Sequence, residues 1–444
     1  MRQAVYRLAE RDPKFHFSKL HNRSAPDSGG VANLATAIQV MRQPDSSSRD
    51  IPGRIERFNA GREPERLALK YREMCKSPFS FFRGSAHLFW EDLAARKGAL
   101  PGSPTVWACG DLHLENFGSF QGDNGLSYFD LNDFDEAALA PSSWEISRFV
   151  ASIYVAAPAL GFTRTDAYQF VKLFLEAYRT ALGHGKAHLV ERDTASGMVK
   201  TLLEQVKKRK RTQLVESLTS SKKGRRRLRI DGKHTLPATD QQRADVERWL
   251  GKFAKSQSDS KFFSVLDVAR RVAGVGSLGL DRYVVLVRGD SHDGNAIIDA
   301  KWPAPSCLAR FERLRQPRWK CEPDRVVAIQ WRLQGTAPAL LDAVKIGRGG
   351  YVLRELQPSK DRLTLKDARG RPGRLRSVIS TMAHVTAWAQ LRSSGRQGSA
   401  VADDLIAFAE AGGWQRPLID YGRLYAAQIE RDFKVFVRTQ KERQ

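Results

Sequence analysis

Three polar residues in one short stretch could carry out phosphate chemistry together. Asp111 and Asn116 stand five residues apart in CGDLHLEN, directly after a short apolar segment, and Asp133 follows a second apolar segment in LNDFDE. A carboxylate can orient or deprotonate an acceptor hydroxyl, and amide and carboxylate oxygens are ligands that Mg²⁺ prefers. We therefore predict that Asp111 acts on the acceptor hydroxyl and that Asn116 and Asp133 bind Mg²⁺.

Position along the chain does not by itself decide which carboxylate binds the metal. Asp130 and Asp135 flank Asp133 in FDLNDFDE, so any of the three could take that role. We predict Asp133 as the main ligand, with Asp135 as a further ligand beside it.

A second group of residues, far downstream, could hold the phosphates of a nucleotide. Gly274, Gly276 and Gly279 form a GxGxxG pattern before the apolar run YVVLV, and Lys301 ends the next apolar run. A glycine-rich turn lets backbone N–H groups approach phosphates, and a lysine at a strand end adds a positive charge. Together they predict a nucleotide-binding site, with ATP and Mg²⁺ as the expected cofactors.

Three further residues complete the expected nucleotide site. Glu355 and Leu356 end the second of two apolar runs, and we expect their backbone to hydrogen-bond the adenine. Arg83, after the aromatic run PFSFF, could contact a phosphate or pair with a carboxylate.

The elements that must position these residues are of two kinds. Apolar spacing of three to four residues predicts helices, and short β-branched runs predict strands. Helices are expected at 66–76, 87–97, 144–157, 166–182, 325–333, 377–391, 401–411 and 421–437, and strands at 105–109, 126–131, 283–287, 296–301, 340–346 and 351–356. The turn GRGG between the last two strands indicates a hairpin.

The same patterns divide the chain into four regions. We expect an irregular or partly helical N-terminal arm at 1–65, and a helical region with the acidic motifs at 66–260. A β-rich region with the glycine pattern follows at 261–358, and C-terminal helices at 359–444 return to the helical region. A basic connector, 207–234, lies inside the second region.

The chain is strongly basic. It has 73 Lys and Arg against 49 Asp and Glu, for a net charge of +24 over 444 residues. Such a surface attracts polyanions without identifying them. The connector holds two basic runs, KKRKR and KKGRRRLR, with no interleaved aromatic residues for base stacking. Nucleic acid is therefore a possible partner but not the favoured one, and we interpret the connector as a solvated loop or an exposed helix face.

Cysteine usage and hydropathy indicate a cellular location. The four cysteines have no CxxC spacing and are too few for a disulfide framework, which favours a reducing compartment. The start of the chain has no apolar leader, and no run is long enough to span a membrane. We expect a soluble cytoplasmic protein.

Taken together, the motifs resemble known families. CGDLHLEN followed by NDFDE is similar to the catalytic core of aminoglycoside and choline kinase-like phosphotransferases. The combination of SPFSFFRG, CGDLHLENFG, FDLNDFDEA and YVLREL resembles DUF2252, a family of uncharacterised bacterial proteins. The resemblance implies that Asp111 matches the catalytic base, Asn116 and Asp133 the metal ligands, and His113 a histidine that holds the loop. Cys109 departs from the pattern, in which a histidine precedes Gly-Asp.

The fold class that follows is α/β (α+β), a protein-kinase-like fold that is circularly permuted. The catalytic loop and the helical lobe come first, and the small β-rich nucleotide lobe follows. Permutation is physically allowed when the original termini lie close together at the surface. It requires Lys301 to lie within a few ångströms of Asp133. No helix glutamate is an evident partner for Lys301, and Glu312 and Glu322 are the candidates.

The predicted reaction is transfer of the γ-phosphoryl group of ATP to a hydroxyl of an unidentified small-molecule or anionic substrate. A metal-dependent phosphoesterase is an alternative, with Asp111-x-His113 and the segment GDSHDGN at 289–295 as ligands. A pseudokinase and a basic polyanion-binding protein are two others, but the second leaves the acidic loop unexplained. A zinc deaminase is excluded because no PCxxC follows His113.

Overall fold

The computed structural model describes residues 49–208, 211–222, 225–290, 294–357 and 363–443. Residues 51–444 cluster into one unit by their contacts, and residues 1–50 into another. Of the expected N-terminal arm, only the end is described, and it contains a helix, Ile51–Asn59, and the start of the next one.

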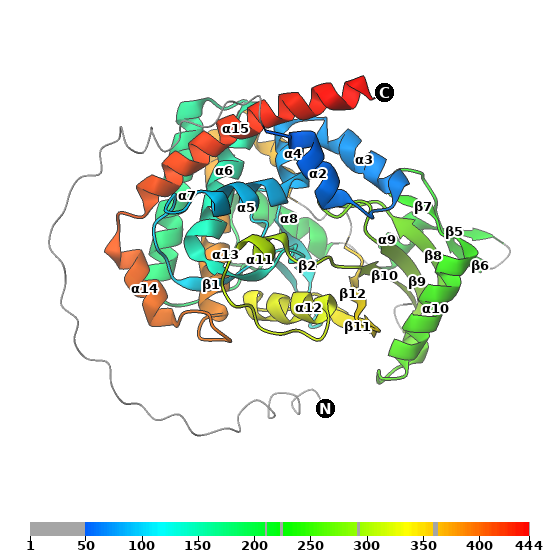
Figure 1. Ribbon diagram of the computed structural model, residues 1–444. Helices are drawn as coiled ribbons and strands as arrows, with labels where there is room; N and C mark the ends of the chain where they lie inside the picture. Colours follow the sequence, from blue (N-terminus) through cyan, green and yellow to red (C-terminus); the bar gives the residue numbers. More distant parts are fainter. Residues whose placement is uncertain (1–48, 209–210, 223–224, 291–293, 358–362, 444) are drawn as a thin grey trace. The chain divides into compact units, whose positions relative to one another are not determined.

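Helices make up most of the unit that begins at Ile51. They are α2 (Ile51–Asn59), α3 (Pro64–Met74), α4 (Pro78–Gly84), α5 (Ala86–Ala95), α6 (Ser142–Ala156), α7 (Arg164–Gly183), α8 (Gly197–Lys207), α9 (Arg211–Leu218), α10 (Asp240–Ala254), α11 (Cys307–Phe311), α12 (Glu322–Leu333), α13 (Pro372–Arg392), α14 (Ala402–Ala411) and α15 (Gln415–Glu442). α6 is buried along nearly its whole length, α7 and α15 pack against it, and α13 packs on α7 (Figure 1).

Every helix expected from apolar spacing is present, with ends that differ by a few residues. α7 begins two residues earlier than expected because Thr163 and Asp166 form a capping box before it. The aromatic run PFSFF, which is too short to predict a helix, forms α4, which Ser77 caps and Pro78 begins.

A six-stranded antiparallel sheet forms the β-rich region, in the order β11-β12-β10-β9-β8-β7. Three two-stranded ladders pair β1 with β4, β2 with β3 and β5 with β6. The strands are β1 (Thr105–Ala108), β2 (Phe117–Gln121), β3 (Ser127–Leu131), β4 (Ala138–Pro141), β5 (Thr219–Lys222), β6 (Arg225–Leu228), β7 (Thr235–Pro237), β8 (Val265–Arg271), β9 (Arg282–Asp290), β10 (Gly294–Lys301), β11 (Asp342–Ile346) and β12 (Gly349–Glu355). The strands expected from the sequence are confirmed, as is a mixed α+β architecture.

The six-stranded sheet has two different faces because successive side chains along a strand point to opposite sides. The outer face packs its apolar side chains against α10, which provides Val246, Trp249 and Leu250 (Figure 1). The opposite face, which we call the inner face, is apolar at one end, where Val215 of α9 packs on Ile297. Its other end is charged, because the inward positions there are Arg271, Arg282, Asp299, Lys301 and Arg354.

The basic connector is more ordered than its composition indicates. Its described residues include α9 and the β5–β6 hairpin, and Val215 and Leu228 pack on the inner face. Arg211 pairs with Glu355 and Arg227 with Asp267, so part of its charge is used within the fold. Most of its described residues are nevertheless exposed, as expected of a solvated loop or an exposed helix face, and Val215 and Leu228 are the apolar side chains that anchor it to the sheet.

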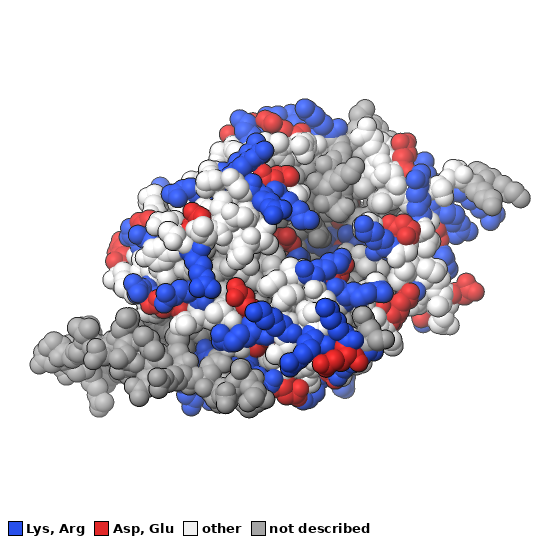
Figure 2. Space-filling model, turned by 90° about the horizontal axis from the view of Figure 1, so that it is seen from above, with Lys and Arg blue, Asp and Glu red and all other residues white. Residues whose placement is uncertain are grey.

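The surface charge and the state of the cysteines agree with what the composition indicates. Lys and Arg side chains are spread over the face in Figure 2, with Asp and Glu side chains between them. All four cysteines are free thiols. No helix within the described ranges is long and apolar enough to cross a membrane.

Candidate active site

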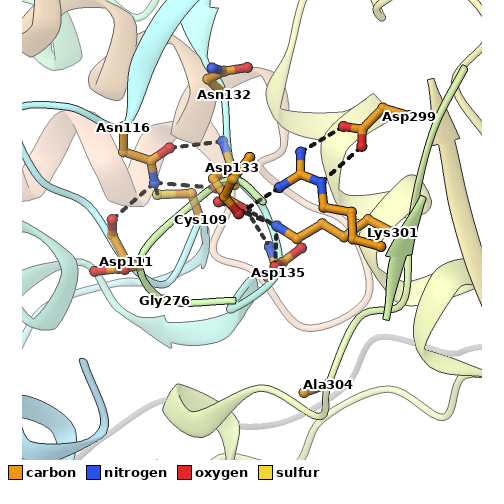
Figure 3. Close-up of polar contacts among 12 residues, drawn as sticks. Cys109, Asp111, Asn116, Asn132, Asp133, Asp135, Gly276, Asp299, Lys301 and Ala304 are labelled. Carbon is orange, nitrogen blue, oxygen red and sulfur yellow. Dashed lines mark hydrogen bonds and ion pairs between the residues drawn. The ribbon is translucent and has the colours of Figure 1, made fainter. Parts of the chain in front are cut away.

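The β1–β4 ladder brings the two acidic loops together. Ala108 lies opposite Ala138 at the end of this ladder, so the loop that leaves β1 and the loop that enters β4 begin at the same edge. The first loop carries Asp111, and the second carries Asp133 and Asp135. The β2–β3 hairpin connects the two loops and turns the chain back. Side chains from two separate motifs therefore meet at one place (Figure 3).

Asn116 ties the two loops to each other. Its Nδ2 donates to the backbone oxygens of Asp111 at 2.9 Å and Asp133 at 3.2 Å (Figure 3). Its Oδ1 accepts from the Asp133 N–H at 2.8 Å, and the side chain is buried. Asn116 therefore holds the loops in position, and only the second lone pair of its amide oxygen is left for a metal ion.

Gly110 is the point where the first loop passes closest to the second. Its φ is 83°, in the left-handed region, and a Cβ at this position would overlap the backbone carbonyl oxygen of Glu136. Glycine is needed here both for its backbone conformation and for the close approach of the two chains.

We expect Gly110→Ala to lower the free energy of unfolding by about 2–4 kcal/mol, because it adds backbone strain and overpacks a tight contact. Gly125→Ala is the matched control. Gly125 has a φ of 76°, and no atom lies within 4 Å of the added Cβ. This variant should therefore lose only about 1 kcal/mol of unfolding free energy, from backbone strain. Urea unfolding of both variants measures the difference, and equal losses would contradict the close approach.

Lys301 reaches the second loop from β10. Its Nζ lies 3.3 Å from Oδ1 of Asp133, and it also pairs with Asp135 (Figure 3). The expected proximity of Lys301 to Asp133 is confirmed, across 168 positions of the chain. Neither candidate glutamate is the partner of Lys301 among the described residues: both of its ion pairs are with aspartates, and Glu322 pairs with Arg325.

The geometry also separates the three candidate carboxylates. Asp130 is buried and pairs with Arg392 at 3.1 Å, so it does not face Lys301. Asp133 and Asp135 are the two that do.

Behind Lys301, on the inner face, lies a buried carboxylate among three arginines. Asp299 lies 2.8 Å from Arg271, 2.6 Å from Arg282 and 3.3 Å from Arg354. Three guanidinium groups around one carboxylate leave an excess of positive charge. With Lys301, this charge faces the aspartates of the second loop, and it suits a phosphate group.

These charges shift the pKa values of Asp133 and Asp135 in opposite directions. Loss of hydration in the loop raises the pKa of Asp133. The positive charges of Lys301, Arg354 and Arg282 outweigh this effect and hold the pKa below its ordinary value. Burial, together with the charge of Asp133, raises the pKa of Asp135. The Asp133 side chain is 52% exposed. It is therefore the more accessible carboxylate of the pair, and the one whose ionised form the neighbouring positive charges favour.

Asp111 is held by a fully buried arginine. Nη2 of Arg148 lies 2.6 Å from Oδ1 of Asp111, and the guanidinium lies 4.1 Å from the ring centroid of Phe82. Burial raises the pKa of Asp111, although Arg148 acts in the opposite direction. The ion pair fixes the carboxylate at the edge of a small cavity of about 50 Å³, which Asp133, Asp135 and Gly276 also line.

The glycine pattern joins β8 to β9 and lies beside this cavity. Gly274 and Gly279 have φ values of 76° and 89°, so both need glycine. Arg62 donates to the carbonyl of Gly276 at 2.7 Å, and the buried Lys70 donates to the same oxygen at 3.0 Å. Burial and the charge of Arg62 lower the pKa of Lys70 well below its ordinary value. The N-terminal helices therefore hold the glycine segment in place.

Glu355 and Leu356 do not offer free backbone donors. The Glu355 N–H donates to the carbonyl of Ala339 at 2.9 Å, and the Leu356 N–H donates to that of Ile297 at 2.8 Å. Leu356 is buried with Val215 of α9. The place expected for the adenine is thus covered by the connector.

The other predicted residues lie around the first loop. Arg83 lines the cavity and forms an ion pair with Glu115. Of the two roles expected for Arg83, pairing with a carboxylate is therefore the one seen in the structure. His113 is buried, and its Nδ1 accepts from the Glu115 N–H at 3.0 Å. Burial, followed by the charges of Arg83 and Arg148, lowers its pKa well below the ordinary value. This neutral histidine stabilises the turn. The segment 289–295 of the phosphoesterase alternative falls partly outside the described residues.

The second acidic loop offers two carboxylates, Asp133 and Asp135, to a metal ion. Within the described ranges, no three His, Cys, Asp or Glu side chains are grouped to hold a metal ion. Mg²⁺ bound with a phosphorylated substrate commonly uses only one or two carboxylates, with water and phosphate oxygens completing its shell. Asp133 and Asp135 supply that number.

Several residues that shape the site gave little signal in the sequence. Arg62 and Lys70 lie on helical or irregular segments whose buried side is polar rather than apolar. Asp299 was detectable, because a carboxylate inside the apolar run AIIDAK needs a partner when buried. Its arginine partners come from three other strands and could not be assigned.

Comparison with known proteins identifies a family and no reaction. A family model described as an uncharacterized protein conserved in bacteria (DUF2252) matches residues 62–439, and the chain belongs to this family. No curated protein and no solved structure matches the chain. The matched residues include both acidic loops, the glycine segment and Lys301.

Proposed function

We propose that this DUF2252 protein is a Mg²⁺-dependent, kinase-like phosphotransferase that transfers the γ-phosphoryl group of ATP to a hydroxyl group. The observation that carries the proposal is the contact of Lys301 with Asp133 and Asp135. It joins the residues predicted to hold phosphates to those predicted to hold the metal. Such a junction is what phosphoryl transfer needs, because the metal bridges the phosphates while a lysine neutralises them.

The order of the elements supports a permuted kinase-like arrangement. β8, the glycine segment, β9, β10 with Lys301, α12 and the β11–β12 hairpin follow one another as the parts of a kinase nucleotide lobe do. The acidic loops precede this lobe in the chain and lie against it in space.

Each residue has a separate role in this proposal. Asp133 would hold Mg²⁺, with Asp135 as a further ligand, and the metal would supply neutralisation of the charge that develops on the transferred group. Lys301 would exchange its carboxylate partners for phosphate oxygens. Asp111, oriented by Arg148, accepts a hydrogen bond from the acceptor hydroxyl, and its raised pKa makes it a better proton acceptor.

The base of ATP does not fit the structure in this arrangement. The expected backbone donors of Glu355 and Leu356 are engaged, and α9 covers the apolar surface beside them. The proposal therefore includes movement of α9 away from Leu356 when ATP binds. The ion pair between Arg211 and Glu355, 2.6 Å long, is the contact that such a movement must break.

Calorimetric titration with ATP and Mg²⁺ tests the proposal. We expect binding that requires the metal and that weakens about tenfold or more in Lys301→Ala, which loses a charged contact to phosphate. Arg211→Ala is expected to bind ATP more tightly than the wild type, because α9 is then easier to displace. Lys252→Ala, an exposed lysine on α10, is the matched control and should leave the affinity unchanged.

Two outcomes count against the proposal. The first is no nucleotide binding with Mg²⁺ or Mn²⁺ in either the wild type or Arg211→Ala. The second is binding that Lys301→Ala and Lys252→Ala weaken equally, which would indicate attraction by net charge alone.

A further inference from the structure

A groove outside the candidate active site gathers positive charge. It has a volume of about 760 Å³ and lies between α8 and the segment 363–377, which leads into α13. It shares no lining residue with the cavity at Asp133. Its charged lining residues are one carboxylate, Asp367, and four cations, Lys366, Arg369, Arg371 and Arg374.

The four cations are available to a ligand. All are exposed, and within the described ranges none of them forms an ion pair with a carboxylate. Arg374 donates only to the backbone carbonyl of Asp367, at 3.4 Å. Four positive charges on one wall repel each other unless an anion lies between them, so the groove is electrostatically suited to a multiply charged anion.

Two helix N-termini open onto the same groove. α8 begins at Gly197 and α13 at Pro372, and residues of both first turns line the groove. Neither helix has a side-chain cap. Helix N-termini carry partial positive charge and present N–H groups, which are suitable donors for phosphate oxygens. The start of α8 lies close to α13: a Cβ built on Gly197 would be 2.9 Å from Oγ of Ser377.

The remaining lining limits the kind of ligand. Hydroxyl and amide groups of Thr201, Gln205, Thr364 and Ser377 line the groove together with the apolar side chains of Met198, Leu202 and Leu363, and none of the described lining residues is aromatic. A nucleobase would therefore find no stacking partner. The volume lies within the range of small-molecule sites, about 300–1,000 Å³.

We propose that this groove binds a small anion that carries several phosphate groups. The source can be a linear polyphosphate or a multiply phosphorylated small molecule, since the cations and the helix ends recognise phosphate oxygens in either. The site is separate from the one that transfers phosphate, and the inference does not depend on the proposed function.

Titration of the full chain with inorganic tripolyphosphate tests this site. The experiment uses Lys301→Ala protein, so that phosphates bound at the candidate active site do not contribute. We expect saturable binding at physiological salt that falls at least about tenfold in Arg369→Gln/Arg371→Gln. Lys252→Gln/Lys255→Gln, at the C-terminal end of α10 and just after it, removes the same charge from exposed positions and should change the affinity by less than about twofold. Thermal unfolding checks that both double variants remain folded.

A second measurement locates the ligand. Tripolyphosphate should slow amide hydrogen exchange in the first turns of α8 and α13 and leave α10 unchanged. A hexakisphosphorylated polyol as a second probe distinguishes a compact anion from a linear one. The proposal is overturned if neither probe binds, or if both double variants weaken binding equally. Groove-dependent binding of duplex DNA without binding of either small anion would also overturn it, and would assign the surface to nucleic acid.

Discussion

Asp133→Asn is expected to reduce Mg²⁺-dependent phosphoryl transfer at least about 100-fold. Asp133 is the accessible carboxylate of the second loop, and the charges of Lys301, Arg354 and Arg282 keep it ionised. The amide has the same size but no charge, so it would bind the metal far more weakly. Release of ADP from ATP, with water or a panel of hydroxyl compounds as acceptor, measures the loss.

The fold should tolerate this substitution, because Lys301 keeps its pair with Asp135. Asp403→Asn, on the exposed surface of α14, is the matched control and should retain full activity. If Asp133→Asn retained metal-dependent turnover at the wild-type rate, Asp133 would not be the metal ligand.

Arg148→Met is expected to lower the free energy of unfolding by about 3–5 kcal/mol, because it leaves the half-buried carboxylate of Asp111 without its ion-pair partner. Methionine has a similar length and suits the surrounding rings of Phe82, Phe89 and Trp90, so the loss would report the charge rather than the packing. Urea unfolding measures it. Arg416→Met, which breaks the exposed pair with Asp420, is the surface control and should cost about 0–1 kcal/mol.

The stability loss of Arg148→Met should also depend on pH. Arg148 acts to lower the pKa of Asp111, so its removal raises that pKa further above the ordinary value. The deficit is therefore greatest where Asp111 would be ionised, near neutral pH, and shrinks as the pH falls and the carboxyl is protonated. Arg148→Met/Asp111→Asn should recover part of the stability at neutral pH. A deficit that is constant with pH, and that the second substitution does not change, would argue against the ion pair.

Regular elements could be predicted because their signal is local. α13 and α15 show apolar residues at helical spacing, and β9 and β10 contain the short apolar runs YVVLV and AII. Each pattern lies within a single segment and requires no knowledge of the neighbouring chain. The sequence does not set the bounds of α9, because few of its residues are apolar and its one buried side chain, Val215, packs on the distant sheet.

The site was only partly predictable for the same reason. The type and spacing of Asp111, Asn116 and Asp133 indicated metal and phosphate chemistry, and the prediction that Lys301 lies near Asp133 is confirmed. The role of Asn116 as a tie between loops depends on backbone groups of both loops. The covering of Leu356 by α9 depends on a segment that precedes it by more than a hundred positions.

The sequence alone determined which chemical groups are present and which segments form helices and strands. It therefore indicated an acidic loop with oxygen ligands and a strand lysine. The tertiary structure decided which charges face each other: Lys301 with Asp133 and Asp135, Arg148 with Asp111, and three arginines around Asp299. The reason is physical. Backbone propensity acts over a few residues, whereas the energy of a charge depends on burial and on neighbours that only the folded chain brings within reach.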